Sequence, residues 1–340
     1  MVANRYSAQQ TLPEIGVAGQ ARIASSKILV VGCGGLAASV LPYLAAAGVG
    51  TITLIDNDVI SISNLNRQVL FTESDLGLNK ALILQQQLEK QNSAISIIAL
   101  TEKFDLLNGI ELAKAHDLVI DCTDSYSSKV TVNYCCIQTK TPLVFASVLG
   151  WDGQIALLTM QETADPCYKC FQKQAPQSIN NCSMSGILGA SVNLIGSHQA
   201  TLTIQYLLGH IHNANFLYVF DLWNLEQRKF KLSKRHDCRF HEHNQNELNY
   251  INYSELPKLE SYILIDIRTV AEWEKGHLPG AKHSSPGKLI LAKQDYATTD
   301  NLVIYCNQDM LSQLVVENLQ NLGYKAFVLK GGYAGYSKNV

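Results

Sequence analysis

The stretch KILVVGCGGLAASVLPYLAAAGVGTITLIDNDVI, residues 27–60, decides the fold. It contains an apolar run, a glycine cluster, a segment of small residues and a second apolar run that ends in two aspartates. Gly32, Gly34 and Ala37 satisfy the pattern G-x-G-x-x-[GA], in which glycines between a strand and a helix let the backbone approach phosphates. The stretch therefore predicts a βαβ unit with a nucleotide site.

Composition limits the class of protein. A chain of 340 residues with 47% apolar residues has room for two domains of about 100–200 residues each. The formal net charge of −2 gives no overall attraction to nucleic acid or to anionic membranes, so neither is expected as a partner. The N-terminus lacks the apolar core of a signal peptide, and the longest apolar run, residues 36–50, is shorter than the roughly 20 residues that span a bilayer.

These features predict a cytoplasmic protein. In that compartment the nine cysteines are better read as metal ligands, working thiols or buried apolar side chains than as a disulfide framework.

Hydrophobic patterning predicts an α/β protein. Apolar runs predict strands at residues 27–31, 51–55, 117–121 and 142–147, and helical spacing predicts helices at 78–91, 127–139 and 187–208. This alternation is typical of a mostly parallel sheet with right-handed crossovers. A polar, histidine-rich stretch separates this region from a second α/β pattern, so we expect domains at 1–243 and 255–340 with a linker at 244–254.

Charged residues behind the glycine loop distinguish two nucleotides. Asp56 ends the second strand, where an acidic side chain binds ribose hydroxyls in NAD and ATP sites alike. Arg67 and Lys80 follow, with Asn64 and Gln68 beside the arginine. Hydride transfer does not call for both cations, whereas breaking a triphosphate does, because charge builds on the departing pyrophosphate. The set favours ATP over NAD.

Two further aspartates close the fourth predicted strand. Asp121 and Asp124 lie at the edge of the sheet where α/β proteins place ligands. Asp124 has two readings, as a ligand of Mg²⁺ beside phosphate oxygens and as the cap of the helix that begins near Ser125, and the two roles are compatible.

Several ordered motifs resemble the MoeB/ThiF family, relatives of the ubiquitin-activating enzymes. They are LPEIGVAGQARI, VVGCGGLAASVLPYLAAAGVGTITLIDNDVISISNLNRQVLF, GLNK, DCTDSY and PCYKC, and they extend over roughly residues 5–241. The resemblance implies a Rossmann-like adenylation domain that binds ATP and Mg²⁺. The residues expected to bind the nucleotide are Gly32, Gly34, Gly35, Asp56, Asp58, Asn64, Arg67, Gln68, Lys80 and Asp124. Arg67, Lys80 and Asp124 are also candidates for catalysis.

Two positions depart from the family pattern. Ala8 replaces the second arginine of an N-terminal R-Y-x-R-Q motif, which in the family reaches into the ATP site of the partner subunit. Ala37 replaces the last glycine of G-x-G-G-L-G, a position that serves helix packing. The family implies a homodimer, and Ala8 bears on the contact between its subunits.

Four residues in two groups have the spacing of a structural zinc site. Cys167 and Cys170 form a C-x-x-C knuckle, and Cys238 and His241 repeat that spacing about seventy residues later. The family normally has a cysteine at the position of His241, so the alternatives are a Cys₃His site, a site completed by His236 or His243, and a site without metal.

Two further thiols are candidates for sulfur chemistry. Cys182 lies in a polar loop ahead of an apolar helix, a position that lowers the pKa of a thiol, and it is either reactive or an idle exposed thiol. Residues 255–340 resemble a rhodanese domain, through LIDIRTVAEWEKGHLPGAKH, VIYCNQDMLSQLVVENLQNLGY and KGGYAGY. Cys306 ends a strand there, a helix is predicted to begin near Ser312, and the backbone N–H groups of the loop between them favour a thiolate or persulfide. Asp266, Arg268 and Glu272 match the rhodanese pattern, and His277 lies in its GHLPGA turn; these residues either have that family's functional role or brace the fold.

Both domains together predict an adenylyltransferase and sulfurtransferase. A ubiquitin-like sulfur carrier of the MoaD/ThiS kind would be adenylated at its C-terminal glycine and then sulfurated from a persulfide on Cys306. The expected sulfur donor is a cysteine desulfurase, and the expected pathway is molybdopterin synthesis, thiamine synthesis or tRNA thiolation. The rival hypotheses are a non-catalytic scaffold for carrier and desulfurase, and an NAD-dependent oxidoreductase fused to a rhodanese.

Overall fold

The computed structural model describes residues 5–106, 108–172, 186–236, 238, 248–291, 296–307 and 309–337. The chain divides into two compact units, a larger one of residues 1–104 and 108–236 and a smaller one of residues 105–107 and 237–340. No described helix has both the length and the apolar character needed to cross a bilayer.

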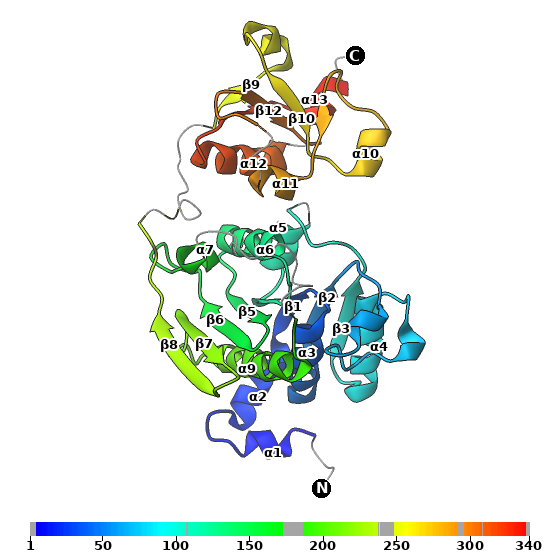
Figure 1. Ribbon diagram of the computed structural model, residues 1–340, viewed down its shortest axis with the longest axis vertical. Helices are drawn as coiled ribbons and strands as arrows, with labels where there is room; N and C mark the ends of the chain where they lie inside the picture. Colours follow the sequence, from blue (N-terminus) through cyan, green and yellow to red (C-terminus); the bar gives the residue numbers. More distant parts are fainter. Residues whose placement is uncertain are drawn as a thin grey trace. The chain divides into compact units, whose positions relative to one another are not determined.

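The larger unit is built on an eight-stranded sheet, counted over the described residues, with the order β3-β2-β1-β4-β5-β6-β7-β8 (Figure 1). Its strands are β1 Lys27–Val31, β2 Thr51–Ile55, β3 Ser96–Leu100, β4 Leu118–Asp121, β5 Leu143–Leu149, β6 Asp152–Leu158, β7 Phe216–Asp221 and β8 Glu226–Lys231. The first five strands in this order, from β3 through β2, β1 and β4 to β5, are parallel, which confirms the predicted parallel sheet. Strands β6 to β8 continue the sheet in antiparallel pairs that the sequence analysis did not predict.

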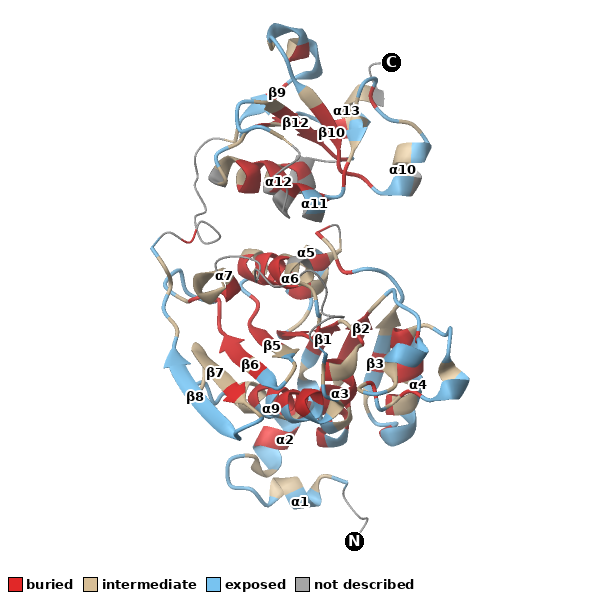
Figure 2. Ribbon diagram, in the orientation of Figure 1, coloured by how far each residue is buried: buried red, intermediate tan, exposed pale blue. Residues whose placement is uncertain are grey.

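Helices cover both faces of this sheet. They are α1 Ser7–Gln10, α2 Gly16–Ser25, α3 Gly35–Ala47, α4 Lys80–Gln91, α5 Gly109–Lys114, α6 Tyr126–Thr139, α7 Tyr168–Phe171 and α9 Gly189–Leu207. Helices α3 and α9 lie on one side of the sheet and α5 and α6 on the other (Figure 1). Strands β1, β4 and β5, which lie between these layers, are mostly buried, whereas β8 at the edge is exposed along its whole length (Figure 2).

The strand order reverses at β1, which pairs with β2 on one side and β4 on the other. In open parallel sheets ligands bind at the carboxyl ends of the strands next to such a reversal. Gly32 follows β1 with φ +89°, and a Cβ there would lie 3.0 Å from the carbonyl oxygen of Cys122. Because only glycine tolerates both conditions, the loop can lie against the end of β4.

Helix α6 begins one residue before its predicted start, and its cap settles one of the two readings of Asp124. The Oγ of Ser125 accepts a hydrogen bond from the backbone N–H of Ser128, so Ser125 caps the helix. The reading of Asp124 as the cap is therefore wrong, since the adjacent hydroxyl takes that role.

The smaller unit contains a second sheet, whose described strands are all parallel in the order β11-β10-β12-β13-β9. Its elements are β9 Tyr250–Ile251, β10 Ile263–Asp266, α10 Val270–Glu274, β11 Lys282–His283, α11 Pro286–Leu291, β12 Asn301–Tyr305, α12 Asp309–Asn321, β13 Lys325–Leu329 and α13 Gly332–Ser337. Its buried core includes Leu264, Val303 and Tyr305.

Two boundaries in this unit differ from prediction. Strand β9 pairs with β13, so Tyr250 and Ile251 belong to the sheet although residues 244–254 were predicted as a linker. A two-residue strand is too short to show an alternating pattern, which explains the error. Helix α12 begins at Asp309 rather than near Ser312, and so lies closer to Cys306 than expected.

Candidate active site

A cavity of about 850 Å³ opens at the carboxyl ends of β1, β2 and β4, a volume in the usual range of ligand sites. It brings together nine of the ten residues expected to bind nucleotide: Gly32, Gly34, Gly35, Asp56, Asp58, Arg67, Gln68, Lys80 and Asp124. Gly34 precedes the first turn of α3, and no side chain caps that turn. Its backbone N–H groups therefore suit an anion such as a phosphate.

Asp56 is held in a fixed position at the end of β2. Its Oδ2 accepts a hydrogen bond from the backbone N–H of Cys33 at 2.6 Å, and its Oδ1 accepts one from Asp58 at 2.8 Å. Burial raises the pKa of Asp56, and the two backbone hydrogen bonds offset part of that rise. The carboxylate thus links the glycine loop to the loop after β2, where it is suited to a ribose hydroxyl.

Lys80 is a nearly buried cation at the first position of α4. Its Nζ lies 3.0 Å from Oδ2 of Asp58, and its side chain is 9% exposed whereas that of Asp58 is 63% exposed. Asn79 caps the helix by accepting a hydrogen bond from Leu82 N–H. The cap and the ion pair orient the ammonium group along the wall of the cavity.

The loop between these elements holds the remaining predicted residues. Arg67 is half-buried, and its guanidinium donates to the carbonyl oxygen of Ser63 at 2.8 Å and to Oδ1 of Asn66 at 3.0 Å. Gln68 is buried, and its Oε1 accepts no hydrogen bond from the described residues, as expected for a polar atom that faces a ligand. Asn64 does not line the cavity, because its Oδ1 accepts from the backbone N–H of Ser61 within the turn.

Asp124 is exposed and lines the cavity, and it makes no hydrogen bond or ion pair with the described residues. A carboxylate available beside a phosphate site fits Mg²⁺, which prefers one or two carboxylates plus phosphate oxygens. Asp121, by contrast, is fully buried and forms an ion pair with Lys129 at 3.1 Å. Of the two aspartates, only Asp124 faces the ligand space.

Several residues of the cavity wall were not predicted from the sequence; they include Ser63, Asn66, Lys103, Phe104, Thr123, Ser128 and Ser147. Lys103 and Phe104 come shortly after β3, a strand that the analysis did not predict. Had the apolar run at Ser96–Leu100 been read as a strand, its carboxyl end would have pointed to this same edge of the sheet.

Three cysteines are close enough to share a metal ion. The thiol sulfurs of Cys167, Cys170 and Cys238 all lie within 4.8 Å of one another, and the first two are 3.9 Å apart. Zn–S bonds of about 2.3 Å place tetrahedral sulfurs about 3.8 Å apart, so the spacing fits zinc. The backbone N–H of Arg235 also donates to the sulfur of Cys170 at 3.5 Å. His241, the predicted fourth ligand, lies outside the described residues, as does Cys182.

Cys306 lies directly after β12, buried, at the entrance to α12. Its sulfur is 3.5 Å from Oγ of Ser312, which lies on the first turn of that helix and is fully buried. The arrangement brings the thiol to a helix N-terminus, which stabilises a thiolate or persulfide charge.

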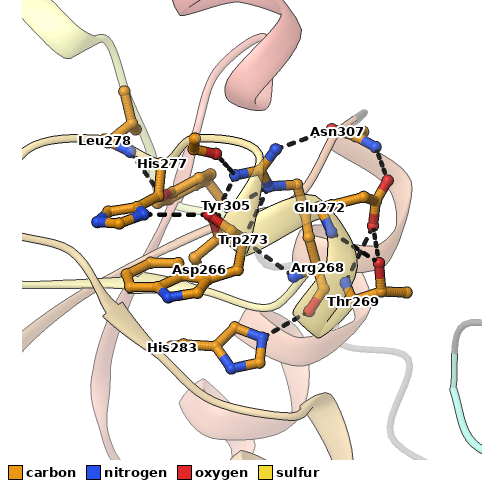
Figure 3. A network of polar contacts seen from close by, with 11 residues as sticks. Asp266, Arg268, Thr269, Glu272, Trp273, His277, Leu278, His283, Tyr305 and Asn307 are labelled. Atoms are coloured by element: carbon orange, nitrogen blue, oxygen red, sulfur yellow. Dashed lines mark hydrogen bonds and ion pairs between the residues drawn. The ribbon is translucent and has the colours of Figure 1, made fainter.

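A polar network around Arg268 holds the end of β10, the strand that pairs with β12 (Figure 3). Arg268 forms an ion pair with Asp266 at 2.7 Å, with both side chains almost fully buried, and it donates to the carbonyl oxygen of Gly276. Its guanidinium also stacks 3.8 Å from the ring centroid of Tyr333. These contacts give Asp266 and Arg268 the bracing role that was one of their two predicted readings.

Glu272 and Asn307 connect the network to the loop after Cys306 (Figure 3). Glu272 completes a capping box with Thr269 and also accepts a hydrogen bond from the side-chain amide of Asn307. Hydrogen bonds from Thr269 above all hold the pKa of Glu272 below its usual range. His277 stacks on Trp273 at 3.5 Å and is exposed, so it packs on the outer side of this network.

Comparison with known proteins identifies both parts of the chain. The sequence model of the ThiF family matches residues 6–240, and that of the rhodanese-like domain matches residues 251–339. The chain belongs to the ThiF family. The ThiF match contains the whole cavity as well as Cys167, Cys170 and Cys238, and the rhodanese-like match contains Cys306. The predicted resemblance to both families is thereby confirmed.

Two similar proteins have both an adenylyltransferase and a sulfurtransferase activity in their names. The chain is 37% identical to adenylyltransferase and sulfurtransferase MOCS3 of Xenopus laevis, over 69% of this chain and 52% of that protein. It is 31% identical to adenylyltransferase and sulfurtransferase UBA4 of Lodderomyces elongisporus, over 99% of this chain and 85% of that protein. The match thus spans about half the length of some curated relatives and most of the length of others.

Solved structures in the same comparison include E. coli MccB, with a TM-score of 0.60 and 23% identity over 69% of this chain and 71% of that chain. An MccB structure with ATP has a TM-score of 0.59 and 24% identity over 69% and 73% of the two chains. At this identity the likeness shows the fold of the larger unit alone.

Proposed function

We propose that this chain adenylates the C-terminal glycine of a ubiquitin-like sulfur carrier and then transfers sulfur to it. The observation that carries the proposal is the cavity at the reversal of the sheet, which joins the glycine loop to Asp56, Lys80 and Asp124. The curated names of MOCS3 and UBA4 support both steps.

In the first step an oxygen of the carrier's terminal carboxylate attacks the α-phosphorus of ATP. The bond to the bridging oxygen breaks, pyrophosphate leaves, and an acyl adenylate forms. The backbone N–H groups after Gly34 would hold phosphate oxygens, Asp56 the ribose, and Lys80 and Arg67 the charge that builds on the leaving group. Asp124 would hold Mg²⁺, which neutralises phosphate charge when it is bound.

In the second step the terminal sulfur of a persulfide on Cys306 attacks the carbonyl carbon, and AMP leaves. The product is an acyl disulfide between the carrier and Cys306. A second thiol, for which we propose Cys182, then attacks the sulfur of Cys306, releases the carrier thiocarboxylate and leaves a disulfide for a dithiol reductant to reduce. The donor of the persulfide sulfur would be a cysteine desulfurase.

Two structural features complete the proposal. Cys167, Cys170 and Cys238, together with His241, would hold a zinc ion whose four protein ligands leave no position for water, so its role would be structural. The chain would act as a cytoplasmic homodimer. Because Ala8 on α1 is exposed and uncharged, that dimer would lack the arginine that the family pattern sends across the interface.

Pyrophosphate exchange tests the first step. Purified full-length chain is incubated with ATP, Mg²⁺, labelled pyrophosphate and a MoaD- or ThiS-like carrier, and the label that returns to ATP is measured. We expect exchange only when the carrier has a free C-terminal glycine. A carrier that lacks this glycine is the control. The absence of exchange with every carrier that has the free glycine would favour the scaffold hypothesis.

A further inference from the structure

We infer that Lys129 is a positioning residue for Asp124 and thereby for the metal–phosphate end of the nucleotide site. This inference rests on the proposed function, because it assumes that Asp124 faces Mg²⁺ and ATP. Lys129 does not line the cavity, and the sequence analysis gave it no role. It lies at the end of the first turn of α6, and its backbone N–H donates a hydrogen bond to the carbonyl oxygen of Ser125, the helix cap.

The ammonium group of Lys129 ties three elements together. Its Nζ donates to Oδ2 of Asp121 at 3.1 Å and to the carbonyl oxygen of Ala146 at 2.7 Å, and it lies 4.9 Å from the ring centroid of Phe145. Asp121 ends β4, while Ala146 lies in β5. A single buried cation thus connects α6 to the end of β4 and to the middle of β5.

The partner carboxylate passes this constraint to the turn that carries Asp124. Oδ1 of Asp121 accepts hydrogen bonds from both the backbone N–H of Thr123, at 2.9 Å, and its hydroxyl, at 2.6 Å. Thr123 and Asp124 both line the cavity. The turn is therefore fixed on one side by Asp121 and on the other by the start of α6, and Lys129 joins these two anchors.

Energetics favour a positioning role over a purely stabilising one. The side chains of Lys129 and Asp121 are 6% and 1% exposed, so both charges are removed from water. Removing an ion pair from water costs about as much as the pair gains, and apolar residues of similar volume often stabilise a core as well. What the pair adds is a fixed geometry, since two charged groups in an apolar environment tolerate few other arrangements.

Calorimetric titration of the full chain with ATP, with and without Mg²⁺, tests this inference without any carrier protein. The Mg²⁺ gain is defined as the ATP affinity measured with Mg²⁺ divided by the ATP affinity measured without it. We expect Lys129→Met to lower the Mg²⁺ gain about tenfold, as for other residues that orient a metal ligand, and to leave the affinity without Mg²⁺ within about twofold. Lys129→Arg, which keeps the charge, should restore most of the gain.

Because Lys129→Met leaves the Asp121 charge buried and unpaired, Asp121→Asn/Lys129→Met is measured beside it, and thermal unfolding checks that each variant is folded. The double variant should lose the same Mg²⁺ gain. Lys140→Met, at the far end of α6, is the matched control and should keep it.

A folded double variant that keeps the full gain would overturn the inference, as would an equal loss of affinity with and without Mg²⁺. Failure of the proposed function gives a different result, namely Mg²⁺-dependent ATP binding without any carrier-dependent exchange.

Discussion

Lys80 is the side chain on which we expect the proposed adenylation step to depend most. Of the two cations predicted for the cavity wall, Arg67 and Lys80, Lys80 is the more buried. Its ion pair with Asp58 and the cap of its helix fix the direction of its side chain. Because both contacts are formed by the protein itself, the ammonium group is already placed before the nucleotide binds. Such a prearranged charge contributes more to the transition state than one that must be reoriented.

We therefore expect Lys80→Ala to lower the carrier-dependent exchange rate by about a hundredfold or more. Lys90→Ala, at the exposed C-terminal end of the same helix, is the matched control and should remain within about twofold of the wild type. Steady-state exchange rates at saturating ATP provide the measurement. A Lys80→Ala rate near that of the control would remove Lys80 from the proposed chemistry.

Individual residues also show how far the sequence alone could go. The glycine loop, Asp56 and Lys80 could be assigned because each follows a strand or begins a helix at a recognisable spacing. Lys129 and Thr123 could not, because their importance depends on burial and on contacts with Asp121 that only the folded chain reveals. A lysine near the N-terminus of a helix, among polar residues, is more often exposed than buried. The burial of Lys129 therefore could not be predicted from the sequence.

At the scale of elements, the C-x-x-C knuckle is the feature whose role can be tested most directly. Its Tyr168 packs on Phe145 at 5.0 Å, and the backbone N–H of Tyr168 donates to Oδ1 of Asn133 on α6 at 2.8 Å. The knuckle is thus packed against the helix that begins beside Asp124. If a metal ion organises it, loss of one ligand should loosen this packing.

We predict that wild-type protein contains one zinc ion per chain and that Cys238→Ala loses most of it, together with several degrees of thermal stability. Elemental analysis of the purified variants gives the metal content. Cys136→Ala, a buried cysteine outside the cluster, is the control and should retain zinc. Unchanged zinc in Cys238→Ala would show that this cysteine is not a ligand.

The network around Arg268 is the corresponding element in the smaller unit. Its ion pair with Asp266 is almost fully buried, and removing one partner of such a pair typically costs about 3–5 kcal/mol. We expect Arg268→Ala to lower the temperature at which the rhodanese-like unit unfolds in calorimetry. Lys275→Ala, at an exposed position, should leave that temperature unchanged. An unchanged transition in Arg268→Ala would mean that the network does not brace this fold.

Elements differed in how well the sequence predicted them. Strands β1, β2 and β4 are continuous apolar runs because both of their faces are buried, and these runs were recognised. The parallel edge strand β3 is only partly buried and was missed. Strand β8 is exposed along its whole length, with the sequence EQRKFK, and β9 has only two residues. Neither has a pattern that distinguishes it from a loop, which is why β8 and the end of the linker were missed.

At the scale of the whole molecule, the proposed function assigns the two halves of one reaction sequence to the two units. A carboxylate does not accept a sulfur nucleophile readily, so an ATP-dependent activation must come before sulfur transfer. The cavity of the ThiF part suits the activation, and Cys306 of the rhodanese-like part suits the transfer. Neither activity alone would produce a thiocarboxylate, which gives the fusion of the two parts a chemical reason.

The most direct test of this account is mass spectrometry of the carrier's C-terminus after incubation with the full chain, ATP, Mg²⁺ and a persulfide donor. We predict a thiocarboxylate with the wild type, and with Cys306→Ala only the carboxylate and its adenylate. Exchange of pyrophosphate should continue in Cys306→Ala, because the adenylation site is intact. A thiocarboxylate formed equally well by Cys306→Ala, or a carrier that remains unmodified by the wild type, would contradict the account.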